Sequence, residues 1–126
     1  MIDSSKSGMG LYKELMKHGC ISDIKPIGTS HDPAIKKSVL FRNGEIPHVT
    51  QVAQAVFLPG QHVKAHSHET MYELFICSQG EGRVILNNQE HQFHEGDFIL
   101  CEPNDTHEVI NDGQIDLVMT VFGIQK

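Results

Sequence analysis

The chain has 126 residues and a mass of 14.1 kDa, the size of one ordinary domain with a core of its own. Hydrophobic residues make up 39% of it and charged residues 21%, which is usual for a globular protein. The net charge of -6, without a basic cluster, argues against nucleic acid or an anionic membrane as the partner. No apolar run reaches membrane-spanning length.

Cysteine usage indicates the compartment. Cys20, Cys77 and Cys101 are odd in number and lack C-x-x-C spacing, which is typical of reduced thiols and not of a disulfide framework. Residues 1–10 contain no apolar segment, so no signal peptide is predicted. We therefore expect a cytoplasmic protein.

Residues 1–36 are predicted to be an N-terminal extension to the main domain. Within them, residues 11–18 predict a short helix that ends at Gly19. Residues 21–34 contain two prolines and little periodicity, so we expect an irregular arm. This arm could wrap its own domain or reach a neighbouring subunit, and the sequence leaves both alternatives open.

Residues 37–126 predict an all-β domain. Turn signals such as Asn43-Gly44 recur every eight to ten residues, with β-branched and aromatic runs between them. Because no helical period occurs in this region, the pattern favours a β-sandwich or barrel. The expected strands are residues 39–42, 50–58, 63–68, 72–77, 83–86, 90–94, 98–101, 106–110 and 115–122.

Two histidines and a glutamate have the spacing of a metal site. His66 and His68 are two residues apart, so on an extended strand their side chains leave the same face. Glu73 follows after four residues, which is enough to turn a corner and begin the next strand. Two imidazoles and a carboxylate can then converge on one divalent ion.

A fourth ligand is expected from the segment 96–111. His107 begins a predicted strand after a turn, and a closed barrel can place this strand beside the strand of His66. If His107 points inward, its neighbour Glu108 points outward, because successive side chains of a strand alternate between its faces.

Together, the two segments resemble the cupin superfamily. Residues 60–80 match that family's G-x5-H-x-H-x4-E-x6-G motif at every fixed position. Residues 96–111 match the glycine, histidine and asparagine of its second motif, G-x5-P-x-G-x2-H-x3-N, but Glu102 replaces the proline and Asn104 the glycine. Asparagine tolerates the left-handed backbone that a turn glycine often adopts, so the ligand histidine is expected to keep its place.

The resemblance covers roughly residues 50–122, with both motifs inside residues 60–111. It implies a double-stranded β-helix, the jelly-roll barrel of cupins. From the strand and turn pattern, we expect residues 37–126 as a whole to form this barrel.

The four candidate ligands, His66, His68, Glu73 and His107, suit one divalent transition metal. Three neutral imidazoles and one carboxylate fit Fe(II), Mn(II), Ni(II), Cu(II) or Zn(II), whereas Ca and Mg prefer oxygen ligands. In octahedral geometry two positions stay open for a substrate or dioxygen. Metal cupins include dioxygenases, oxalate-degrading enzymes and sugar-phosphate isomerases, and no residue here singles out one of these.

Neighbours of the ligands are expected to line a pocket. Phe75 and Cys77 share a strand face with Glu73, and Tyr72 could lie at the rim, although packing is the more common role for such a residue. Gln51 and Gln54 lie on opposite strand faces, so at most one reaches the pocket. The remaining histidines are expected at the surface: His18, His31, His48, His62, His91 and His94.

Three functions stay open at this stage. The first is an enzyme that acts on a small organic molecule at a mononuclear metal, by a dioxygenase-like or isomerase-like reaction. The second is a non-catalytic module that binds or senses a small molecule through the metal, and the third is a metal-free structural barrel. A homodimer is also expected, because residues 51–57 are partly apolar on both strand faces.

Overall fold

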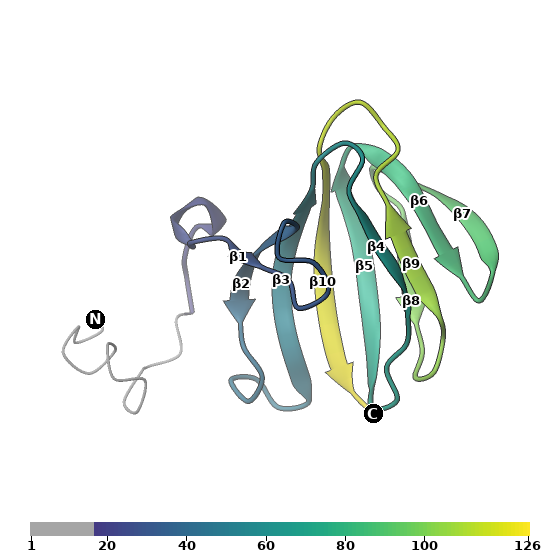
Figure 1. Ribbon diagram of the computed structural model, residues 1–126. Helices are drawn as coiled ribbons and strands as arrows, with labels where there is room; N and C mark the ends of the chain where they lie inside the picture. Colours follow the sequence, from purple (N-terminus) through teal and green to yellow (C-terminus); the bar gives the residue numbers. More distant parts are fainter. Residues whose placement is uncertain (1–16) are drawn as a thin grey trace.

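The computed structural model describes residues 17–126, which form two antiparallel β-sheets that face each other (Figure 1). The first sheet has six strands in the order β1-β2-β3-β10-β5-β8, and the second has four in the order β4-β9-β6-β7. The six strands are β1 (Ile27–Gly28), β2 (Lys36–Phe41), β3 (Val49–Phe57), β10 (Leu117–Gln125), β5 (Met71–Gln79) and β8 (Phe98–Cys101). The four are β4 (His62–His66), β9 (His107–Ile110), β6 (Glu81–Leu86) and β7 (Gln89–His94).

This architecture is the double-stranded β-helix that the sequence predicts. Every predicted strand range overlaps one observed strand, from β2 to β10, because alternating side chains and turn residues mark each of them. Only the two-residue strand β1 comes from a segment for which no strand is predicted. Among residues 17–126, no helix is long and apolar enough to cross a membrane.

The predicted N-terminal helix is not found in the described part of the chain. Residues 11–16 of the predicted range lie outside the described residues, and residues 17 and 18 are not helical. The helical turn that follows is a 3₁₀ turn, η1 (Ile21–Asp23), closed by the N–H of Ile24 on the carbonyl of Ile21. Pro26 follows shortly after and lacks the N–H that a continuing helix would need.

Residues 27–35 of the arm pack on their own barrel. β1 pairs with β2, and the N–H of Thr29 donates to the carbonyl of Ile35 at 2.9 Å. Ile35 itself is fully buried in the core. Residues 27–35 therefore belong to the same sheet and core as the barrel, while the division between residues 1–36 and 37–126 stays a prediction about domain organisation.

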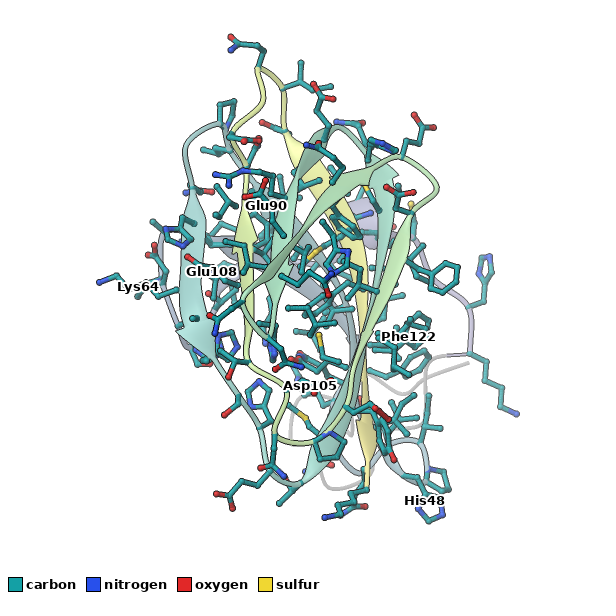
Figure 2. All side chains as sticks on the ribbon, turned by 90° about the vertical axis from the view of Figure 1, so that its right-hand side faces the viewer. His48, Lys64, Glu90, Asp105, Glu108 and Phe122 are labelled. Atoms are coloured by element: carbon teal, nitrogen blue, oxygen red, sulfur yellow. The ribbon has the colours of Figure 1, made fainter. Side chains whose placement is uncertain are left out.

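The core fills the space between the two sheets (Figure 2). Alternate residues of each strand point inward, so that Phe57, Phe75 and Phe93 come from different strands and meet in one cluster. Phe122 lies on the opposite side of β10 and faces away from the second sheet. The cluster consists of Ile35, Ala55, Phe57, Val63, Phe75, Cys77, Val84, Phe93, Cys101, Val109, Leu117, Met119 and Val121.

Left-handed backbone positions shape the turns between the strands. Asn104 has φ 73°, so the asparagine adopts the conformation expected at the motif's usual glycine position. Gly80, at the turn between β5 and β6, has φ 82°, and a Cβ there would collide with the carbonyl oxygen of Asp116. This turn needs glycine for both its conformation and its lack of a side chain.

Substituting Gly80→Ala should destabilise the fold by about 3 kcal/mol, combining the left-handed penalty with a backbone collision. Gly44→Ala is the matched control, because Gly44 has φ 94° but open space around its Cβ position. The control should cost only about 1 kcal/mol. Urea unfolding of both variants measures the difference, and equal losses would show that the collision is relieved at no cost.

Candidate metal centre

Four side chains converge between the sheets. His66 ends β4 and pairs directly with His107 at the start of β9, so the strand register brings these two imidazoles together. Glu73 approaches from β5 in the facing sheet. His68 was expected at the end of the strand but lies in the loop that follows β4. One ligand atom from each of the four residues lies within 4.8 Å of all the others. The residues proposed from the sequence thus form one cluster of donors.

Backbone carbonyls orient two of the imidazoles. Nδ1 of His66 lies 2.9 Å from the carbonyl of Lys64, and Nδ1 of His107 lies 3.1 Å from the carbonyl of Asp105. Because a carbonyl only accepts hydrogen bonds, each Nδ1 donates its hydrogen, and in the neutral ring Nε2 keeps a free lone pair. This arrangement is the usual one for metal-ligating histidines.

In the neutral ring, the Nε2 lone pair of His107 has no donor within residues 17–126 from which to accept a hydrogen bond. Its Nε2 is buried, and among the described residues no group bonds to it with hydrogen-bond geometry. The carboxylate Oε1 of Glu73 lies 3.1 Å from this nitrogen and 3.2 Å from Nε2 of His68. Two nitrogens therefore face one buried oxygen, and a cation between them would satisfy all three atoms. The donor set fits a divalent transition metal.

The charges of the cluster respond to one another. Burial would raise the pKa of Glu73, but the facing imidazole of His107 and the nearby imidazoles of His68 and His66 lower it. Burial would likewise lower the pKa of His107, but the Cys101 thiol and the Glu73 carboxylate raise it to about 10. Burial lowers the pKa of His66, which keeps this imidazole neutral and available as a ligand. The cluster holds an ionised carboxylate and favours a positive charge beside it.

The loop that carries His68 is held through its main chain. The N–H of Asn104 donates to the carbonyl of His68 at 2.7 Å, and the N–H of Lys126 donates to the carbonyl of Thr70 at 2.8 Å. The loop is therefore tied both to the turn before β9 and to the end of the chain. These bonds place His68 beside Glu73 although no strand holds it.

A cavity of about 150 Å³ opens beside the four donors. Its walls are mostly apolar, and they include Phe75 as expected. Tyr72 and Cys77 are not among the described residues that line it. Tyr72 alternates to the outer face of β5, and Cys77 lies deeper in the core, where its thiol contacts the carbonyl of Gln79. The other lining residues are Thr29, Ser30, His31, Lys37, Gln51, Ala53, Ala55, Phe57, Val63, Met71, Val109, Met119 and Val121.

One residue of the arm and one residue of β2 reach the cavity, although no sequence pattern predicts that they do. His31 is largely exposed, as expected for a surface histidine, yet its ring lies against that of His66, with the centroids 4.0 Å apart and the planes tilted by 37°. Lys37 lines the cavity from β2 and donates to Oε1 of Gln51 at 2.9 Å. Gln51 is the glutamine that reaches the cavity, whereas Gln54 is on the other strand face, as the spacing of three predicts.

The asparagine of the second motif has a structural role. Asn111 is fully buried, and its Nδ2 donates to the carbonyls of Phe57 and Ile115 at 2.8 and 3.0 Å. Its Oδ1 accepts from the N–H of Gly113 at 2.9 Å. Asn111 thereby fixes the end of β9 against the end of β3, at the opposite end of β9 from His107.

The fold and the donor cluster define a jelly-roll barrel with a candidate His/Glu metal site inside it. The family described as Cupin domain matches residues 53–123, more than half of the chain, and the protein belongs to this family. Cupins commonly bind a metal, and the four donors form a potential site for one.

Comparisons with individual proteins agree with this assignment. The chain is 29% identical over 94 residues to an uncharacterized protein of Methanocaldococcus jannaschii, covering 75% of this chain and 74% of that protein. It is 30% identical over 59 residues to an oxalate-binding protein of Thermotoga maritima, covering 47% of this chain and 49% of the other. The crystal structure of a predicted oxalate decarboxylase from Thermotoga maritima superposes with a TM-score of 0.79 at 22% identity, over 85% of this chain and 97% of that one, which shows a shared fold.

Metal binding should release a proton at neutral pH. With a pKa of about 10, His107 is protonated in the metal-free protein at pH 7, and a divalent ion binds only the neutral imidazole. We expect about one proton released per metal ion, so the apparent affinity should rise roughly tenfold per pH unit between pH 7 and 9.

Calorimetric titration in two buffers of different ionisation enthalpy measures this proton release. The same titration of a chelator of known proton release calibrates the buffers. A binding heat that does not depend on the buffer would show that His107 carries no proton before the metal arrives.

Proposed function

We propose that this protein holds one divalent transition metal with His66, His68, Glu73 and His107, and that it acts on a small organic molecule in the adjoining cavity. The observation that carries this proposal is the buried Nε2 of His107, which faces the Glu73 carboxylate and has no other partner in the described chain, so that a cation is needed between the two atoms. Without a metal ion, a proton on His107 takes that place, in keeping with its raised pKa, and a divalent ion would replace the proton.

The donor set suits Fe(II), Mn(II), Ni(II), Cu(II) or Zn(II). Such an ion, when bound, supplies Lewis-acid polarisation of a ligand oxygen at its open positions. The chain itself supplies the environment: Phe75, Val109 and Val121 are apolar walls that exclude water and lower the local dielectric. The backbone carbonyls behind His66 and His107 hold the donor nitrogens toward the cavity.

A dioxygenase-like or isomerase-like reaction is the activity we propose first, because the cavity beside the donors leaves room for a reacting molecule. A non-catalytic binding module is the second candidate. One observation favours it: apart from the four donors, the ionisable side chains that line the cavity within the described chain are His31 and Lys37. The names of two similar proteins concern oxalate, which supports a small organic acid as ligand in either case.

Substituting Glu73→Gln should weaken metal binding by more than about 100-fold, because losing even a residue behind a ligand typically costs 10- to 100-fold. Glu69→Gln is the matched control, since Glu69 is an exposed carboxylate in the adjacent loop. Metal content after purification without chelator, and the shift of the melting temperature on adding metal, measure the effect. Metal at 1,000 times its Kd stabilises a fold by about 4 kcal/mol.

Retention of metal by Glu73→Gln at the level of Glu69→Gln would contradict the proposed site. With the metal-loaded wild type, oxygen-uptake and isomerisation screens then separate the two candidate functions. Turnover of a small molecule supports the enzyme, whereas tight binding of a metabolite without turnover supports the binding module.

We also propose a homodimer, in which the outer face of the six-stranded sheet is covered by a second copy. Apolar residues follow one another across this face in register: Val52 is opposite Phe122, which is opposite Leu74, which is opposite Leu100. On the edge strand β8, Phe98 is 71% exposed and Leu100 45% exposed. A stable dimer buries about 800 Å² on each partner, and an apolar sheet face suits that purpose.

The double variant Phe98→Ser and Leu100→Ser should shift the protein from dimer to monomer by weakening association at least about 100-fold, at roughly 1.5 kcal/mol or more for each side chain. Sedimentation velocity at micromolar concentration measures the distribution. A wild-type protein that sediments only as a 14.1 kDa species would contradict the proposed dimer.

A further inference from the structure

Lys37 is a charged residue of the cavity that the donor cluster does not use. It lies on β2 opposite Ala55 of β3, and its half-buried side chain lines the cavity. Its Nζ donates to Oε1 of Gln51 at 2.9 Å, which fixes the ammonium with a neutral partner. No carboxylate within residues 17–126 forms an ion pair with it. Within the described residues, no ion pair therefore offsets the charge of this side chain at the cavity wall.

The sheet register relates this ammonium to the candidate metal centre. Gln51 of β3 pairs with Gly123 of β10, and Gly123 pairs with Glu73 of β5. Gln51 and Glu73 thus belong to one cross-strand row, separated by two strand spacings, or about 10 Å between their backbones. Both side chains line the same cavity. A ligand between them would meet the metal at one end and the ammonium at the other.

The charge balance of the cavity favours an anion. A divalent ion contributes +2, Glu73 contributes -1, and Lys37 contributes +1, while neutral histidine ligands contribute nothing. This leaves an excess of about two positive charges, in a protein whose net charge is -6. Apart from Glu73, the described lining residues include no carboxylate to offset it. The apolar walls strengthen each charge interaction by excluding water.

The size of the cavity limits the ligand. A volume of about 150 Å³ is below the roughly 300–1,000 Å³ of pockets for drug-sized molecules. The ring of His31, which lies against that of His66, adds a further wall on the side of the arm. A cavity of this size suits a ligand of a few carbon atoms.

We propose that the cavity selects small organic acids with two acidic groups, one directed at the open metal positions and the other paired with the Lys37 ammonium that Gln51 holds in place. This inference rests on the proposed metal centre and names the class of its ligand. Lys37 is accordingly a specificity-determining residue.

The test compares malonate with acetate on the full-length protein loaded with Mn(II) or Zn(II), by calorimetric titration with metal content measured before and after. Malonate should bind the wild type at least tenfold more tightly than acetate. Lys37→Met should weaken malonate binding by about 10- to 100-fold, the usual effect of losing a charge-assisted hydrogen bond, while acetate binding changes less than about threefold.

Two variants serve as controls. Lys36→Met removes the neighbouring lysine, whose Nζ donates to the carbonyl of Pro33 outside the cavity, and should leave malonate binding unchanged. Lys37→Arg keeps the positive charge and should restore at least part of the affinity that Lys37→Met loses.

The outcomes separate this inference from the proposed function. If the wild type and Lys37→Met both retain metal but bind malonate equally, the role of Lys37 is overturned and the metal centre stands. Equal affinity of the wild type for malonate and acetate overturns it as well. If the wild type retains no metal, the proposed metal centre fails and this inference fails with it.

Discussion

The buried carboxylate of Glu73 is the constraint on which the site depends. The residue is only 7% exposed and has three imidazoles around its carboxylate, so the carboxylate stays ionised only with positive charge nearby. In the metal-free protein a proton on His107 meets that need, and a divalent ion would meet it better because His68 then gains a partner as well. His66 and His107 pair across two strands of the opposite sheet, so both present their imidazoles to the same carboxylate.

Much of the fold and the donor cluster could be predicted from the sequence. The strands are recognisable because a side-chain period of two, bounded by glycine and asparagine turns, has few other structural solutions. The four donors are recognisable because His66, His68 and Glu73 have a fixed local spacing, and the second motif keeps His107 despite Glu102 and Asn104. Asn104 shows why the departure was tolerated: its left-handed φ of 73° replaces what a glycine would do.

The cavity walls were less predictable, because they depend on contacts between distant segments. His31 belongs to an arm without periodicity, and only the pairing of β1 with β2 brings it onto His66. Lys37 is one of two adjacent lysines, and its inward direction follows from a strand register that the sequence does not specify. Cys77 points inward from β5, as its spacing from Glu73 predicts. It lies farther along the strand, however, in the part of the core beyond the cavity.

The loop of His68 has a consequence for how this site can diversify. Main-chain bonds from Asn104 and Lys126 anchor the loop, while the side chains of Ser67, Glu69 and Thr70 point to solvent. The position of the metal-donor atoms therefore does not depend on which residues occupy these three positions. Substitutions can accumulate there, or be engineered there to alter charge and access at the rim, with the coordination geometry left intact.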